Sequence, residues 1–457
     1  MKKISGRRYR YNKFRSGRDY KKQNDDIECK LKWIRYCFRF QCTFWEKRHF
    51  MDKEKNMNNK KNANKPHSRL DCDVVIVGCG VGGLYSALNL DHSKKILMLS
   101  KDAVDICDSM LAQGGICVLH DEGDYDAFFE DTLRAGHYEN RKESVDIMIR
   151  SSRDVINDLI SKGVEFERDE KGELTYTKEG AHSIPRICFH EDITGKEITT
   201  KLLANVRKLD NVSIMEYTCM TDLLEDETGR ICGVLAEKDN SSIEIYAGDV
   251  IFATGGIGGQ YAYSTNYRIL TGDGCRIASD HGAELEHMDY VQIHPTCLYR
   301  KKKGRNFLIS ESARGEGAII LNHKGERFVD ELLPRDVVTE AIRKEMEKEG
   351  VKYEFLSFEN VPDEVIRNHF PHICETCLED GYDIFREPVP IVPAQHYFMG
   401  GIHVDSNSET TLPHLYAVGE TSCNGVHGKN RLASNSLLES LVFAARAARK
   451  INSEAIE

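Results

Sequence analysis

The stretch 73–83 constrains the fold of this chain more than any other part of the sequence. Its short run of β-branched apolar residues predicts a fully buried parallel strand. The strand ends in the spacing Gly78-x-Gly80-x-x-Gly83, and an apolar helix pattern follows directly. In this spacing the first glycine permits a tight turn, the second lets a pyrophosphate approach the backbone, and the third lets helix and strand pack closely. The sequence therefore predicts an α/β fold with a dinucleotide site; the alternative is a glycine-rich turn in an ordinary α/β domain.

Composition narrows the classes of protein to which the chain can belong. Its 457 residues suffice for two or three domains with a sizeable core. The net charge of −10 argues against nucleic acid as the main partner. No apolar run approaches the roughly 20 residues that a membrane span needs, so no membrane is expected as a partner.

The number and spacing of the cysteines indicate the cellular compartment of the protein. There are 15 of them, scattered and odd in number, and no secretory signal precedes them. This usage is typical of a reducing environment, so we expect a cytoplasmic location. Cys374-x-x-Cys377 stands alone, without a second pair at metal-ligand spacing, and no metal site is expected.

Residues 1–70 differ in composition from the rest. Lys and Arg outnumber Asp and Glu about three to one there, and the one apolar cluster, at 33–45, is interrupted by Arg and Gln. We expect a basic, disordered extension that takes no part in the fold. An arm that binds nucleic acid or a membrane surface is the alternative.

Three strand-to-glycine edges, ending at Gly78, Gly255 and Gly419, organise the remainder of the chain. Between them, short strands at 212–215, 231–236 and 243–246 are expected to pair in antiparallel fashion. The pattern changes near residue 288, where motifs rich in His and Arg begin. We therefore expect a nucleotide-binding domain in two parts, 71–287 and 398–457, around an inserted domain at 288–397. This arrangement fits a flavoprotein better than a nicotinamide dehydrogenase.

From about residue 71 to residue 450 the chain resembles the flavoprotein family of fumarate reductase, succinate dehydrogenase and L-aspartate oxidase. The resemblance is carried by the motifs QIHPT at 292–296, AQHYFMGG at 394–401 and GKNRLASNS at 428–436. It implies a Rossmann-like FAD-binding domain with an inserted α+β capping domain. Better-known members continue into a C-terminal helical domain, which we expect to be absent here.

The resemblance implies that FAD is the cofactor and is held without a covalent bond. Respiratory members carry a covalently linked His in the pattern His-Thr-x-x-Ala-Gln-Gly-Gly, where this chain has Asp108; soluble fumarate reductases also lack the link. Ser100 and Lys101 stand where an acidic residue usually binds the ribose. Glu420 can accept from a ribose hydroxyl, and the helix beginning near Ser436 can point its dipole at reduced flavin, the alternative being an ordinary helix cap. The expected cofactor-binding residues are Gly78, Gly80, Val81, Gly82, Gly83, Ser100, Lys101, Asp108, Ser109, Ala112, Gln113, Gly114, Gly115, Asp273, Glu420, Ser436 and Leu437.

A substrate with two carboxylates requires cations. The motifs place His294, His396 and Arg431 in that role, with Ser310 as a hydroxyl donor. Arginine offers a planar fork that matches a carboxylate. Taken alone, each histidine could equally be a structural residue.

Arg335 resembles the proton-transfer residue of the family. Because a free arginine is too basic to accept a proton, a neighbour such as Glu311 must relay the proton or perturb the guanidinium. The alternative is a structural ion pair at a helix N-terminus. Glu311 and Gln292 complete the expected substrate-binding set with Ser310.

Glu179 distinguishes members of the family by substrate. In aspartate-oxidising members the acid at this place faces the substrate's amino group, which gives a charge complementarity that succinate lacks. The resemblance therefore implies FAD-dependent oxidation of L-aspartate to iminoaspartate, with oxygen or fumarate as electron acceptor. This is the first step of NAD synthesis through quinolinate, so quinolinate synthase would act next. The alternatives are a soluble fumarate reductase or succinate dehydrogenase-type flavoprotein, and a flavin-binding module whose basic tail binds RNA.

Overall fold

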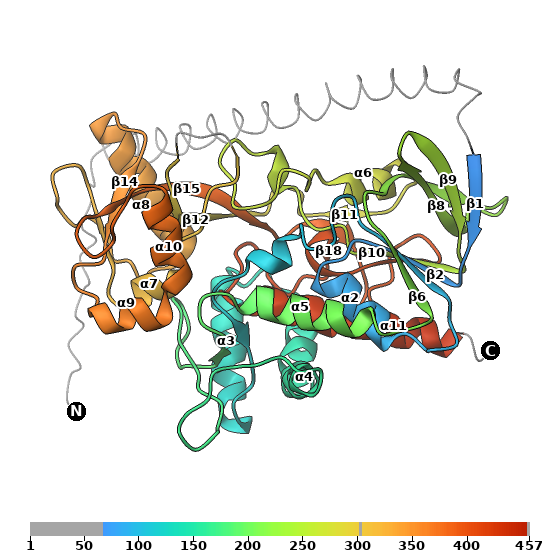
Figure 1. Ribbon diagram of the computed structural model, residues 1–457, viewed down its shortest axis with the longest axis horizontal. Helices are drawn as coiled ribbons and strands as arrows, with labels where there is room; N and C mark the ends of the chain where they lie inside the picture. Colours follow the sequence, from blue (N-terminus) through green and yellow to red (C-terminus); the bar gives the residue numbers. More distant parts are fainter. Residues whose placement is uncertain (1–66, 301–303, 455–457) are drawn as a thin grey trace, which may run out of the picture. The chain divides into compact units, whose positions relative to one another are not determined.

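The computed structural model describes residues 67–300 and 304–454. Apart from its last residues, the predicted basic extension lies outside this part. The central element is a five-stranded parallel sheet in the order β17-β10-β2-β3-β6 (Figure 1). Its strands are β2 (Val74–Val77), β3 (Ile96–Leu99), β6 (Val212–Met215), β10 (Asp249–Phe252) and β17 (Leu415–Ala417). The chain runs from β2 to β3 on one side and later adds β10 on the other, so the strand order reverses beside β2. Ligands of open α/β sheets bind at such a reversal, outside the carboxyl ends of the strands.

Two hydrophobic cores cover the two faces of this sheet. Val74 and Ile76 of β2 point into the first core, and Val75 and Val77 point into the second, as the period of a strand dictates. Helices form the first core, and α11 packs against both α2 and α4 (Figure 1). These helices are α2 (Val81–Asn89), α3 (Tyr125–Ala135), α4 (Lys142–Ser161), α5 (Thr194–Val206) and α11 (Asn435–Glu454). A second sheet and α6 (Asp273–Asp280) form the other core.

The second sheet has the order β1-β9-β8-β7. Its strands are β1 (His67–Asp71), β7 (Cys219–Glu225), β8 (Ile231–Lys238) and β9 (Ser241–Tyr246). β8 pairs antiparallel with β9, as predicted, but the prediction for 212–215 is wrong: β6 pairs parallel with β3 in the central sheet. Strand β7 was not predicted, because its pairing with β8 shifts register twice and breaks the alternating pattern. Strand β1 begins at His67, before the predicted domain boundary at residue 71.

Residues between 291 and 398 build a separate antiparallel sheet in the order β12-β15-β14-β13. Its strands are β12 (Val291–Leu298), β13 (Ile319–Leu321), β14 (Glu354–Ser357) and β15 (Val389–Phe398). The accompanying helices are α7 (Glu311–Gly315), α8 (Arg335–Glu349), α9 (Asp363–His369) and α10 (Pro371–Glu379). This α+β segment has a hydrophobic core of its own and is drawn mainly in orange in Figure 1.

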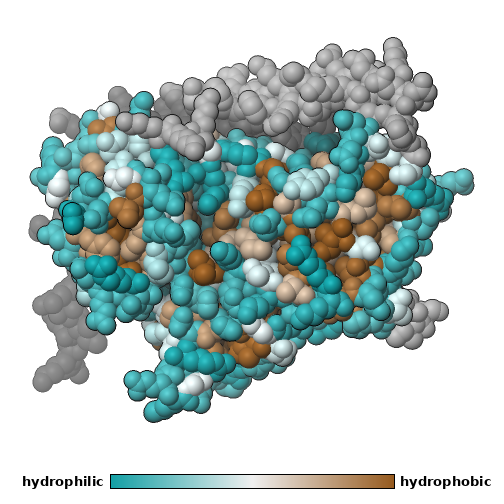
Figure 2. All heavy atoms as spheres, in the orientation of Figure 1, coloured by the Kyte–Doolittle hydropathy of each residue, from teal (hydrophilic) through white to brown (hydrophobic). Residues whose placement is uncertain are grey.

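Short elements complete the described chain and bring loops to the carboxyl edge of the central sheet. They are β4 (Ile116–Cys117), β5 (Ile187–Cys188), β11 (Leu285–Glu286), β16 (Gly401–His403), β18 (Ser422–Cys423), η1 (Asp108–Leu111), η2 (Glu122–Asp124), η3 (Gly258–Gln260) and η4 (Gly419–Thr421). In Figure 2 the visible face is mostly polar, with apolar residues gathered in separate patches. Among the described helices, none combines the length and apolarity that crossing a membrane requires.

Candidate active site

One continuous cavity is lined by nearly all of the predicted cofactor and substrate residues. It runs along the carboxyl edge of the central sheet and into the α+β segment. Every predicted cofactor residue except Gly83 lines it, and every predicted substrate residue except Gln292. Gly83 lies against the turn at Gly78, and Gln292 lies behind two of the lining arginines. The structure therefore brings together residues that are up to about 360 positions apart in the sequence.

The turn between β2 and α2 fits a pyrophosphate. Gly78 has φ +115°, and a Cβ there would lie 2.0 Å from the carbonyl oxygen of Ala253. A Cβ on Gly83 would lie 2.0 Å from the carbonyl oxygen of Gly78. The first N–H groups of α2 have no partner within the helix, and that of Val81 donates to Ser109 Oγ at 3.1 Å. This bare backbone at a helix N-terminus suits the phosphates of a dinucleotide.

Two polar groups mark the far end of the predicted cofactor site. Lys101 Nζ forms a 2.5 Å ion pair with Asp273 and donates to the carbonyl of Ile269 at 3.0 Å. These contacts tie the end of β3 to the loop before α6. The cation is thus neutralised by protein, and this wall of the cavity presents a fixed, nearly neutral polar surface.

Two carboxyl groups on the cavity wall, Asp108 and Glu420, can accept hydrogen bonds from a ligand. Asp108 accepts from the backbone N–H of Tyr267 at 2.9 Å through one oxygen, whereas its other oxygen is buried without a partner. Glu420 accepts from the N–H of Phe398 at 2.9 Å. Burial raises the pKa of Asp108 to about 7 and that of Glu420 to about 8. Both groups fit the hydroxyl-rich chain and ribose of FAD.

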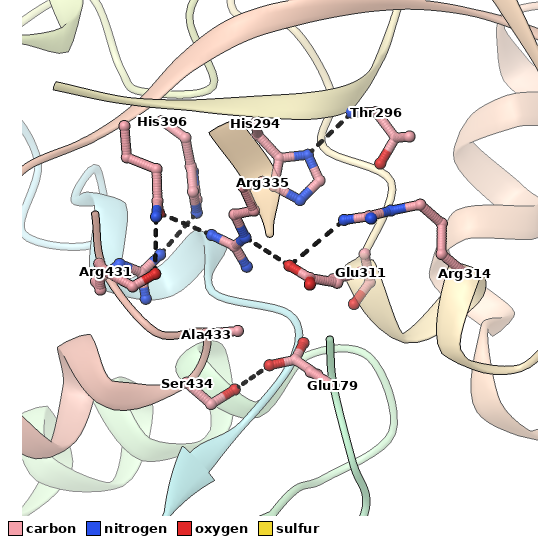
Figure 3. A network of polar contacts seen from close by, with 12 residues as sticks. Glu179, His294, Thr296, Glu311, Arg314, Arg335, His396, Arg431, Ala433 and Ser434 are labelled. Atoms are coloured by element: carbon pink, nitrogen blue, oxygen red, sulfur yellow. Dashed lines mark hydrogen bonds and ion pairs between the residues drawn. The ribbon is translucent and has the colours of Figure 1, made fainter. Parts of the chain in front are cut away.

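The other end of the cavity holds a dense cluster of charged side chains (Figure 3). Arg335 is the first residue of α8, and Arg431 belongs to the loop before α11. Arg335 donates from Nε to Glu311 at 2.5 Å and from Nη1 to Gln292 at 2.9 Å. Gln292 in turn donates to the carbonyl of Arg431 at 2.8 Å, so one buried amide links the two arginines. Burial and the nearby charge of Arg335 lower the pKa of Arg431 to about 10, which still leaves it cationic at neutral pH.

Hydrogen bonds fix both histidines in the neutral state. Arg431 donates to Nε2 of His396 at 3.1 Å, so Nδ1 carries the proton and meets Thr265 at 2.9 Å. The backbone N–H of Thr296 donates to Nδ1 of His294 at 3.3 Å, which leaves its Nε2–H buried and without a partner among the residues that the structure describes. Burial lowers both pKa values well below the usual range. The sequence-based expectation of histidine cations is therefore corrected: positive charge comes from the arginines, and His294 offers a neutral donor.

The two glutamates of the cluster have pKa values shifted in opposite directions. Burial raises the pKa of Glu311, but the guanidinium groups of Arg335 and Arg314 outweigh it and leave the pKa lowered. Burial, together with the charge of Glu311, raises the pKa of Glu179. Glu179 accepts from Ser434 Oγ at 2.5 Å and makes no ion pair within 4.0 Å in the described part of the chain. Glu311 is thus a fixed anion, and Glu179 is open to a ligand's cation.

Sequence reasoning missed several residues of the cavity. Tyr397 lies under Arg431, with its ring centroid 4.5 Å from the guanidinium carbon, and Ser434 holds Glu179. Both lie inside the quoted motifs and could have been assigned from them. Thr265 and Arg305 also line the cavity but carry no local signal, because only the tertiary fold brings their loops to it. Ser310 lies at the predicted place, where it caps α7.

Comparison with known proteins identifies the family of the chain. The family model described as FAD binding domain matches residues 73–437. L-aspartate oxidase from Clostridium perfringens is 52% identical, over 83% of this chain and 87% of its own length. L-aspartate oxidase from Clostridium acetobutylicum is 48% identical, over 84% and 88%. The chain belongs to the L-aspartate oxidase family.

A solved structure supports the fold of this L-aspartate oxidase family member. The E. coli quinol fumarate reductase matches with a TM-score of 0.80 and 30% identity, over 85% of this chain and 71% of that one. The family predicted from the sequence is confirmed, as are the mixed α/β FAD-binding fold and FAD as cofactor.

Proposed function

We propose that the chain oxidises L-aspartate to iminoaspartate with FAD, as the first step of NAD biosynthesis through quinolinate. One observation carries the proposal: buried arginines and a neutral histidine donor face a carboxyl group, Glu179, that has no ion-pair partner in the described residues (Figure 3). An amino diacid presents two anions and one cation to such a site. A plain diacid would leave Glu179 without a cationic partner.

The carboxylates of the substrate would be bound by Arg431 and Arg335, with the free Nε2–H of His294 as a third donor. Guanidinium groups suit this role because they donate two parallel hydrogen bonds to one carboxylate. His396 would act through Arg431, whose position it fixes, since both of its ring nitrogens are already bonded. The site would thus hold the diacid in one orientation over the cofactor.

Glu179 would bind the amino group of the substrate and accept a proton from it. Its raised pKa makes it a better proton acceptor than an ordinary carboxylate. FAD, when bound, supplies the acceptor for the hydride that leaves the α-carbon. Arg335 would orient the substrate and balance its charge, because its hydrogen bonds to Glu311 and Gln292 fix the position of the guanidinium.

The finer assignments extend this proposal. Residues 288–397 would act as a capping domain on an FAD-binding domain formed by 71–287 and 398–457. FAD would be held without a covalent bond, since Asp108 offers no nucleophilic ring nitrogen. Oxygen or fumarate would accept the electrons in the cytoplasm, and quinolinate synthase would use the product. A fumarate reductase function is the second candidate, because the same arginines would bind fumarate and the E. coli quinol fumarate reductase shares the fold.

The product identifies the reaction. FAD-loaded protein is incubated with L-aspartate, either in air or without oxygen but with fumarate. We expect oxaloacetate and ammonia, from hydrolysis of the imine, together with peroxide in air or succinate in the presence of fumarate. Fumarate reduction by an artificial electron donor without any aspartate-dependent product would favour the second candidate.

A further inference from the structure

The loop that carries Glu179 is anchored on a fully buried ion-pair cluster. Arg186, which is 0% exposed, donates to Asp124 at 2.8 and 3.0 Å and to Asp131 at 2.8 Å. The N–H and hydroxyl of Ser183 both donate to the same oxygen of Asp131, each at 2.7 Å. Removing one member of such a cluster leaves an uncompensated buried charge, so the cluster is a fixed support for the loop.

His182 connects this support to another segment of the site. Nη1 of Arg186 lies 3.0 Å from Nδ1 of His182, and because a guanidinium can only donate, Nδ1 is the acceptor. The proton is therefore on Nε2, which donates to the carbonyl of Ala433 at 3.1 Å. The neutral state is stable at physiological pH, since burial and the charge of Arg186 lower the pKa of His182 to about 4.

We call the hydrogen bond from His182 to the carbonyl of Ala433 the bridge. A residue with strained backbone lies next to each of its two ends. Ala181 has φ +67° and Ser434 has φ +61°, a region that residues with a Cβ seldom adopt. Such conformations persist only where neighbouring contacts determine them. Ala181 is held by Arg134, which donates to its carbonyl at 3.2 Å, and Ser434 by the N–H of Cys117, at 3.0 Å. The hydrogen bond from His182 to Ala433 ties the two strained segments together.

These two segments carry groups that would bind different parts of the substrate, the amino group in one case and a carboxylate in the other. Glu179 precedes His182 in one segment, and Arg431 precedes Ala433 in the other. We propose that His182 is a positioning residue whose bridge to Ala433 sets the distance between Glu179 and Arg431, and with it the preference for an amino diacid over a plain diacid. The inference rests on the proposed function.

Three substitutions at His182 separate the bridge from general stability. In His182→Phe, Arg186 keeps its hydrogen bonds to Asp124 and Asp131, but the bridge to Ala433 is lost. We expect kcat/KM for aspartate oxidation to fall by roughly 10²-fold, the cost of misplacing a reacting group by about 1 Å. Fumarate reduction with a dye as electron donor should change by less than about tenfold, because fumarate has no amino group for Glu179 to bind.

The amide variants test which ring nitrogen matters. The side-chain nitrogen of glutamine in His182→Gln reaches the position of Nε2 and can donate to Ala433, so the preference for aspartate should be largely restored. Asparagine in His182→Asn reaches only the position of Nδ1, facing Arg186, and should behave like phenylalanine. Equal rescue by both amides, or rescue by asparagine alone, would overturn the proposal.

A double variant and a control complete the activity test. If His182 acts through Glu179, the pair Glu179→Gln and His182→Phe should lose no more aspartate oxidation than Glu179→Gln alone. The matched control is His414→Phe, because His414 meets Asp249 at 2.9 Å where β17 and β10 begin, at the end of the sheet opposite to the cavity. Its ratio of aspartate oxidation to fumarate reduction should equal that of the wild type. Additive losses in the double variant would contradict the proposal.

Hydrogen exchange gives a readout that does not depend on the reaction. In the FAD-loaded protein, His182→Phe should speed amide exchange in both 177–183 and 431–434, whereas His182→Gln should not. Unchanged amide protection in either segment of His182→Phe would contradict the proposed role of the bridge. Wild-type protein that fails to oxidise aspartate while these segments loosen as expected would instead contradict the proposed function alone.

Discussion

Glu420 shows how a single residue links the cofactor site to stability. Its carboxyl group follows β17, accepts one backbone hydrogen bond and otherwise faces the cavity. Desolvation raises its pKa to about 8, so the folded protein without FAD holds a proton that the unfolded chain releases near its ordinary value of 4.5. A ribose hydroxyl that donates to this group would relieve the cost of ionising it.

The pH dependence of stability follows from this shift. The contribution of Glu420 is complete below about pH 4.5 and is lost as the pH rises through about 8. The free energy of unfolding of the FAD-free protein should therefore fall over this range, and Glu420→Gln should remove a slope of up to about 1.4 kcal/mol per pH unit. Denaturant titrations at several pH values measure this slope. Identical slopes for variant and wild type would contradict the shift.

Motifs in the sequence predicted which residues would form the site, but not the hydrogen bonds that set their charge states. Arg431 lies in the motif at 428–436, and the structure places it in one cavity with Glu179 and Arg335, as the prediction requires. The charge state of the histidines was not predictable, because it depends on donors such as the N–H of Thr296 and the guanidinium of Arg431. Thr265 was missed because nothing in its own segment marks it.

At the scale of elements, the β2–α2 unit was fully predictable and the second sheet was not. Glycine spacing and a β-branched run define β2 and α2 locally. The partner of β6 was predicted wrongly, because four residues of mixed burial carry no information on which strand lies beside them. Register shifts in β7 removed the alternation by which a strand is recognised.

The packing of α2 on its strand gives a steric prediction. In Gly83→Ala the new Cβ would lie 2.0 Å from the carbonyl oxygen of Gly78, and this contact can be relieved only by moving the backbone. We expect a loss of about 3 kcal/mol or more in unfolding free energy, together with loss of bound FAD. The control is Gly82→Ala, whose Cβ would meet a methyl group of Val418 at 3.3 Å. Thermal unfolding of the FAD-free proteins should show the control far closer to the wild type, and equal losses of stability would contradict the packing argument.

At the scale of the whole molecule, the cavity is made by bringing distant segments together. The glycine turn, the Glu179 loop, the α+β segment and the start of α11 each contribute one part. Local sequence predicted each part, yet their convergence on one cavity followed only from resemblance to a family. The resemblance could not supply the hydrogen bonds between the site residues, such as those by which the side-chain amide of Gln292 links the two arginines.

The central claim is that this cavity holds FAD beneath a site built for an amino diacid. The most direct test mixes FAD-loaded protein with L-aspartate or succinate without oxygen and follows the visible absorption band of oxidised flavin. We expect that L-aspartate bleaches the band and that succinate does so far more slowly, because only aspartate offers a cation to Glu179. Bleaching by succinate alone would contradict the claim.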